Sequence, residues 1–192
     1  YERLISTLSA SGIACCGTSF PSYESVSGAQ VKAYLGGSFG TDPDSVNAFA
    51  ASSFFAVDRY ASFKTDPWGD TYRNGGLVIS ARYTTSNAIH QASKLFPEKR
   101  DEFFTWLEDY EYNHLDLPRP DAVFFLDLPV EIAIDHILSR EAETGVPRDI
   151  HERDFSYLRA CAEAADHAAE FFGWTRIKVA ENGKMLSPDS IG

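Results

Sequence analysis

Short apolar runs alternate with helically spaced apolar positions along most of this chain. The apolar runs predict strands over 13–20, over the stretch from Leu77 that breaks at Arg82, over 122–128 and over 175–180. A continuous apolar run of this length is typical of a parallel strand that is buried on both faces. Strands separated by helical segments predict an α/β fold with a largely parallel sheet and right-handed crossovers.

Apolar residues at helical spacing predict the intervening elements. Phe103, Leu107 and Tyr110, for example, are four and three positions apart and form one stripe of a helix. Residues 141–148 lack such periodicity and predict an exposed loop. The expected helices cover 1–10, 31–35, a long segment capped by Asp44 and Ser45 that ends near 63, 68–74, a segment opened by the polar residues 84–86, 98–112, a segment from Pro129 to Arg140, and 151–172.

Composition narrows the class of protein. The 192 residues, of which 44% are hydrophobic, show no shift in composition and no linker, so we expect a single domain over 1–192. Cys15, Cys16 and Cys161 lack metal-ligand spacing and indicate buried thiols in a reducing compartment, hence a cytoplasmic protein. No apolar run approaches the roughly 20 residues of a membrane span. A net charge of −11 argues against nucleic acid as a partner.

One polar cluster follows the second expected strand, in the region where open α/β sheets bind ligands. Arg82 comes directly after this strand, and an arginine fork suits phosphate or carboxylate. Asn87, His90 and Gln91 lie on one face of the next helix, where polar side chains could contact a heterocycle. The alternative is a solvated polar helix face.

Three further clusters each have a structural alternative. Residues 20–23 leave the first strand, and Phe20 could simply be a core aromatic. Phe55 and Arg59, four apart on a helix, could stack on a base and hydrogen-bond it, or could be a core phenylalanine beside an arginine that pairs with a surface carboxylate. Arginines within 140–153 could close over phosphates, or the segment could be a solvated loop. The histidines show no metal-ligand spacing, so no metal site built from protein side chains is expected.

The chain resembles the thymidylate kinases, which are P-loop nucleoside-monophosphate kinases, in an ordered set of segments. These are FPSY, VKAYLGGSFG, FAVDRYASF, GLVISARYTTSNAIHQ, LPRPDAVFFLDLPVEIA and the segment ending RDIHERD. The resemblance implies a doubly wound α/β fold with helices on both faces of the sheet, a homodimer, and transfer of the γ-phosphoryl group of MgATP to dTMP. Mg²⁺ is the implied cofactor. The Ala/Ser-rich stretch 48–53 is the candidate dimer contact.

The resemblance also implies roles for single residues. Phe20 and Tyr23 would lie along the sugar and phosphate of dTMP, Phe55 would stack on thymine, and Arg59 would hydrogen-bond it. Arg82 would hold the dTMP phosphate, while a mobile lid at about 140–150 would cover the ATP phosphates. The implied catalytic residues are Arg82, Arg140 and Arg148, of which Arg140 and Arg148 also contact ATP. The implied dTMP contacts are Phe20, Tyr23, Phe55, Arg59, Arg82, Ser86, Asn87, His90, Gln91, Asp149 and His151.

Two departures from the family pattern leave alternatives open. The sequence has no first strand with the phosphate loop G-x-x-x-x-G-K-S/T, and it begins inside a helical pattern without a methionine, so we expect a sequence clipped at both ends. Ala81 stands where the family usually has an aspartate. The alternatives are a non-catalytic nucleotide-binding or interaction protein of the same fold, and a related kinase for another nucleotide such as dUMP.

Overall fold

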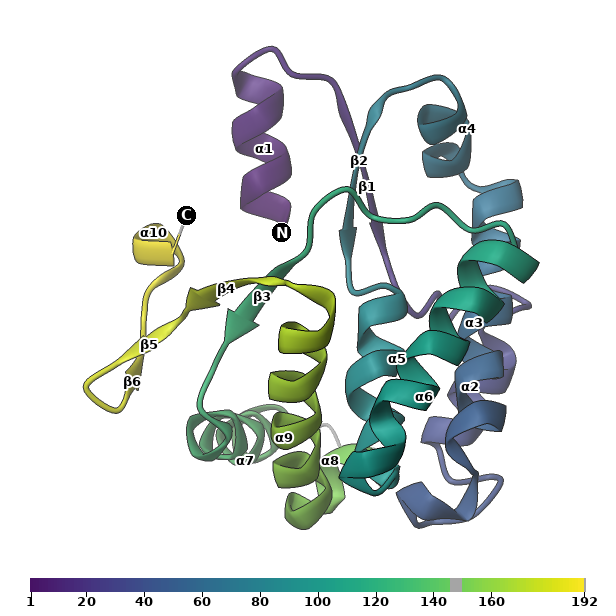
Figure 1. The fold of residues 1–192 in the computed structure, drawn as a ribbon. Helices are drawn as coiled ribbons and strands as arrows, with labels where there is room; N and C mark the ends of the chain where they lie inside the picture. The colour runs from purple at the N-terminus through teal and green to yellow at the C-terminus, as the bar shows by residue number, and fades with distance from the viewer. Residues whose placement is uncertain (146–149, 192) are drawn as a thin grey trace.

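The computed structural model describes residues 1–145 and 150–191, which form helices around two short parallel β-pairs (Figure 1). None of the helices in these ranges is long and apolar enough to cross a lipid bilayer. The strands are β1 (Cys15–Ser19), β2 (Leu77–Ala81), β3 (Phe124–Asp127), β4 (Thr175–Lys178), β5 (Ala180–Glu181) and β6 (Lys184–Met185). The helices are α1 (Glu2–Ala10), α2 (Ala29–Leu35), α3 (Ala48–Thr65), α4 (Pro67–Arg73), α5 (Thr84–His90), α6 (Pro97–Glu108), α7 (Val130–Thr144), α8 (Ile150–Arg153), α9 (Phe155–Phe172) and α10 (Pro188–Ile191), with short helical turns η1 (Pro43–Ser45), η2 (Ala92–Lys94) and the π-helix η3 (Asp109–His114).

The strands confirm the expected parallel direction. β1 pairs with β2 in a register that places Cys15 opposite Leu77, and β3 pairs with β4 with Phe124 opposite Thr175. Among the described residues these two parallel pairs are not hydrogen-bonded to each other. A short antiparallel hairpin, β5 and β6, follows β4. The side chains of Phe124 and Leu126 on β3 are 63% and 57% exposed, so β3 lacks the two-sided cover expected of a central strand.

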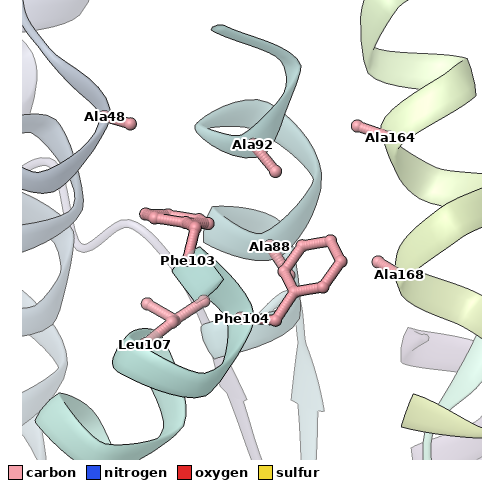
Figure 2. Close-up of a cluster of buried hydrophobic side chains, with 8 residues drawn as sticks. All are labelled: Ala48, Ala88, Ala92, Phe103, Phe104, Leu107, Ala164 and Ala168. Atoms are coloured by element: carbon pink, nitrogen blue, oxygen red, sulfur yellow. The ribbon is translucent and has the colours of Figure 1, made fainter. Parts of the chain in front are cut away.

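The main hydrophobic core fixes α5 between other helices (Figure 2). Small alanines on α3, α5, η2 and α9 allow close approach, and the rings of Phe103 and Phe104 on α6 fill the space between them. α5 contacts α3, α6 and α9. Because close-packed interiors deform little, the face of α5 that is turned away from this core has a fixed position. The cluster comprises Ala48, Ala88, Ala92, Phe103, Phe104, Leu107, Ala164 and Ala168.

Helix boundaries depart from the expected ones where a local cap decides them. Asn47, not Asp44 or Ser45, caps α3, since its side-chain oxygen accepts a hydrogen bond from the Ala50 N–H at 2.9 Å. The expected helix over 151–172 is two helices, α8 and α9. They separate at Asp154, whose carboxylate accepts hydrogen bonds from the backbone N–H groups of Ser156 and Tyr157. A polar residue within an apolar repeat can therefore start a new helix.

Two further expectations from periodicity need correction. The loop expected from Glu141 onward is helical as far as Thr144, because α7 ends only at Gly145, a glycine with a φ of 67°. The helix expected over 98–112 changes at Asp109 into the π-helix η3. This change matters for the site described below, because η3 carries Glu111.

Candidate functional site

One cavity of about 220 Å³ brings together most of the residues that the sequence analysis singled out. They come from the segment after β1, from α2, α3, α7, α8 and α9, and from the segment between β2 and η2. Of the residues implied by the family resemblance, the cavity is lined by Phe20, Tyr23, Phe55, Arg59, Arg82, Ser86, Asn87, His90, Gln91 and His151. The remaining lining residues are Pro21, Leu35, Tyr83, Ile137, Glu152 and Leu158.

Arg82 turns the chain from β2 into α5. Its φ is 65°, in the left-handed region that non-glycine residues seldom adopt. An L-residue pays roughly 1–2 kcal/mol there, so the surrounding structure holds this arginine in an unfavourable backbone conformation. Such strain is concentrated at functional sites. The turn places the exposed guanidinium beside the cavity, where its Nη2 lies 3.1 Å from His90 Nε2.

His90 is neutral in this environment. Burial lowers its pKa well below the usual histidine value, and the positive charge of Arg82 and the neighbouring His151 and Lys94 lower it further. Arg82 can therefore donate to the unprotonated Nε2, and the ring proton resides on Nδ1, 3.6 Å from the Cys161 sulfur. Because His90 is neutral, the positive charge of this pair lies on Arg82.

The site also contains a buried polar network. Arg59 forms a bidentate ion pair with Glu111, with Nε and Nη2 at 2.7 and 2.5 Å from the two carboxylate oxygens. The Nδ2 of Asn87 donates both to the same carboxylate, at 3.2 Å, and to the Ser52 carbonyl, at 3.1 Å. The side chains of Arg59 and Glu111 are only 1% and 0% exposed. The structural alternative for Arg59 was a pair with a surface carboxylate, but its partner Glu111 is buried and does not line the cavity.

Aromatic side chains form the walls around these polar groups. Phe20 packs edge-on against Trp68 and beside Tyr83, so the core alternative for Phe20 and its place in the cavity are both correct. Phe55 lies edge-on to Tyr34, with 6.2 Å between ring centroids. Burial raises the pKa of Tyr112 to about 12, so its phenol, which contacts Thr84, is neutral.

His151 is held at the cavity by a directional chain of hydrogen bonds. Lys94 Nζ donates to the Tyr34 hydroxyl at 2.8 Å, and that hydroxyl lies 2.9 Å from His151 Nε2. Burial, followed by Lys94 and Arg82, lowers the pKa of His151 to about 3, while burial lowers the pKa of Lys94 to about 8. A neutral His151 accepts from Tyr34, because Tyr34 accepts from the ammonium group. The ring of His151 also stacks on that of His90 at 5.6 Å.

Two buried polar side chains have no hydrogen-bond partner among the described residues. Both polar atoms of the Gln91 amide are unpaired, although Gln91 is fully buried and lines the cavity, and Ser52 Oγ is unpaired as well. An unpaired buried polar group costs about 1–3 kcal/mol. The amide of Gln91 can therefore gain hydrogen bonds from a polar ligand.

The segment that carries Tyr23 is fixed by a buried carboxylate that the sequence analysis did not select. Asp58, 1% exposed, accepts hydrogen bonds from the Ser22 N–H at 2.8 Å and from the hydroxyls of Ser27 and Ser25 at 2.9 and 3.2 Å. Glu111, Tyr34 and Lys94 were missed in the same way. Each lies far along the chain from its partner, so no local spacing could indicate the contact.

Of the two arginines expected over the ATP phosphates, only Arg140 lies within the described residues. Arg140 does not line the cavity, and its Nη2 lies 2.6 Å from a Glu152 carboxylate oxygen. Arg148 and Asp149 lie outside the described residues, as do residues 146 and 147 of the expected lid. Within the described ranges, no group of three or more His, Cys, Asp or Glu side chains is placed to hold a metal ion.

Comparison with known proteins decides the family. The Thymidylate kinase family model matches residues 1–191. The chain belongs to this family. It is 31% identical to the thymidylate kinases of two Mycobacterium tuberculosis strains, CDC 1551 / Oshkosh and ATCC 25618 / H37Rv, over 176 residues that make up 90% of this chain and 79% of each relative.

Membership in the thymidylate kinase family makes this chain a kinase with an α/β fold of the P-loop type. Kinases of this family use ATP with Mg²⁺. The described residues of this member form a cavity of about 220 Å³ lined by Arg59 and Arg82, and they include no group of three or more His, Cys, Asp or Glu side chains placed to hold a metal ion.

Proposed function

We propose that this protein transfers the γ-phosphoryl group of MgATP to dTMP and releases dTDP. The single observation that carries the proposal is the cavity that joins Arg82 with Phe55 and the Arg59–Asn87 pair. A thymidine monophosphate needs an anion-binding group, an apolar surface for its base, and hydrogen-bond partners for the base edge. All three types of group line one cavity.

The hydrogen-bond donors and acceptors that Arg59 and Asn87 offer support thymine as the base. Arg59 has only N–H groups to offer, so it can donate to a carbonyl oxygen such as O4 of thymine. Asn87 uses its Nδ2 on Glu111 and Ser52, which leaves its Oδ1 as an acceptor for the N3–H of thymine. Cytosine has an acceptor at N3 and a donor at position 4, the reverse of this arrangement. Gln91 offers a further donor and acceptor to the base.

Arg82 supports the acceptor phosphate in this proposal. The attacking group is an ionised phosphate oxygen, so no strong general base is needed and positioning with charge neutralisation carries the reaction. Arg82 would hold the dTMP phosphate, with Phe20 and Tyr23 along the sugar and phosphate and His90 beside the base. Ser86 and His151 would also contact dTMP. Arg140 and Arg148 would act near the transferred phosphoryl group, and Asp149 would contact dTMP. Mg²⁺ would neutralise the ATP phosphates.

Ala81 favours a second candidate, a protein that binds the nucleotide without phosphorylating it. A hydrophobic methyl group in this position cannot take the part of the aspartate that the family usually has there. A third candidate is phosphorylation of dUMP, because the Arg59 and Asn87 contacts do not involve the thymine methyl group.

The experiment is a pair of measurements on the full-length protein. Titration calorimetry with dTMP tests the site, and a coupled ADP-release assay with MgATP and dTMP, dUMP, dCMP or dGMP tests the reaction. We expect dTMP to bind and to be the preferred acceptor. Binding without turnover would favour the second candidate, and equal turnover of dUMP the third. Absence of dTMP binding would refute the assignment of the cavity.

We further propose a homodimer whose contact surface differs from the one expected from the sequence. The Ala/Ser-rich stretch 48–53 was the candidate, but Ala48, Ala51 and Ser52 are buried within their own molecule. The opposite face of α3 exposes Phe49, Val57 and Tyr60, at 42%, 50% and 38%. Phe49 also packs edge-on against Trp106 of α6. Exposed apolar side chains in one helical stripe fit a second copy of the same chain.

A further inference from the structure

Glu111 is the central hydrogen-bond acceptor of the buried network that it forms with Arg59 and Asn87. Its carboxylate is 0% exposed and receives three hydrogen bonds, two from Arg59 and one from Asn87. A buried carboxylate is costly unless its charge is paired and its oxygens are hydrogen-bonded, and here both conditions are met. Glu111 does not itself line the cavity.

The position of Glu111 depends on the π-helix η3. Helix α6 ends at Glu108, and η3 continues from Asp109 to His114. Glu111 lies in this wider turn, whereas Glu108 pairs at the surface with Arg119 at 2.8 Å. Short π-helical segments are frequently found at functional sites. Arg59 reaches the carboxylate from α3, and Asn87 reaches it from α5.

The carboxylate determines which atoms its two partners can offer to a ligand. Arg59 has five N–H groups and gives two to Glu111, so the others can donate into the cavity. Asn87 could in principle turn its amide either way. Both neighbours of its Nδ2, the carboxylate and the Ser52 carbonyl, are acceptors, and therefore only one orientation satisfies the network.

We infer that Glu111 is a positioning residue that sets nucleobase specificity, by holding Arg59 as the donor and Asn87 as the acceptor of the pocket. The inference rests on the proposed binding of dTMP. An imide edge, which has a carbonyl oxygen beside an N–H, matches this polarity, and the amidine-like edge of cytosine opposes it. Glu111 thus selects thymine and uracil over cytosine without contacting the base.

The variant Glu111→Gln tests this directly, because glutamine has the same shape but replaces one acceptor oxygen by a donor. Whichever way the new amide lies, one N–H faces an N–H of Arg59 or Asn87. Rotation of the Asn87 amide would relieve the conflict with the new N–H at the loss of the Ser52 hydrogen bond, and would present Nδ2 to the ligand, which favours cytosine. We expect the ratio of the dCMP to the dTMP dissociation constant to fall by about tenfold or more, as the loss or reversal of one buried hydrogen bond predicts.

Glu108→Gln is the matched control, since it makes the same chemical change on the adjacent turn, at the surface. We expect it to change the ratio by less than about twofold, because exposed ion pairs contribute little. An unchanged ratio in a folded Glu111→Gln protein would overturn the inference. If the wild-type protein binds no dTMP, the proposed function fails instead, so the two failures can be told apart. Equal weakening of both nucleotides would show a purely structural role and would also overturn it.

A second measurement does not depend on whether Glu111→Gln folds. The Arg59 Nε–H in ¹⁵N-labelled wild-type protein should be protected from exchange both without nucleotide and with saturating dTMP, because it stays bonded to Glu111. Loss of this protected signal when dTMP binds would show that the ligand takes Arg59 away from Glu111, and the inference would fail.

Discussion

Substitutions at Arg82 should separate the strain of its backbone from the binding by its side chain. Arg82→Ala and Arg82→Gly both remove the guanidinium and its contact with His90. Alanine retains the penalty of about 1–2 kcal/mol for a φ of 65°, and glycine does not. Glycine loses about 0.5–1 kcal/mol through the greater freedom of its unfolded chain. The glycine variant should therefore be about 1 kcal/mol more stable than the alanine variant.

Both variants should bind dTMP about ten- to a hundredfold more weakly than the wild-type protein, as expected for loss of charged hydrogen bonds to a phosphate. Urea denaturation gives the free energies of unfolding, and calorimetry gives the affinities. Asp116, exposed and with a φ of 53°, provides the control pair. Asp116→Gly should likewise be more stable than Asp116→Ala, without any change in dTMP affinity.

Two results would refute this reasoning. Equal stability of the alanine and glycine variants at position 82, combined with a clear difference at position 116, would show that the backbone of Arg82 is not strained. Wild-type affinity for dTMP in Arg82→Ala would show that the guanidinium does not hold the phosphate, even if the backbone argument is correct.

Three other predictions follow from buried groups. His151 should destabilise the protein at acidic pH: since its pKa is lowered from 6.5 to about 3, the unfolded chain binds the proton first, and the free energy of unfolding should drop by about 2 kcal/mol between pH 7 and 5. In denaturation series at both pH values, His151→Gln should lack this part of the drop. Phe104→Ala should cost about 3–5 kcal/mol in urea denaturation because the ring is fully buried in the core, whereas a cost below 1 kcal/mol would contradict the packing in Figure 2. Val57→Glu should halve the mass measured by light scattering if α3 forms the dimer contact, and an unchanged dimer would exclude that face.

Local sequence signals predicted most of the elements and much of the cavity. The apolar runs located β1 to β4, and the residue spacing placed Asn87 and Gln91 on one face of α5 because a helix repeats every 3.6 residues. Strand exits marked Phe20 and Arg82, both of which line the cavity. Errors arose where one cap outweighed periodicity, at Asn47, Asp154 and Gly145.

The order of residues in this chain determined the family, the positions of most helices and strands, and many of the side chains that line the cavity. Such features depend on neighbouring residues and on motifs that occur in a fixed order. The tertiary structure alone decided the partners: Glu111 for Arg59 across 52 positions, and Tyr34 for His151 across 117. Burial and long-range pairing set the protonation of His151 and the hydrogen-bond polarity of the pocket, because both depend on which groups lose water and which face each other in space.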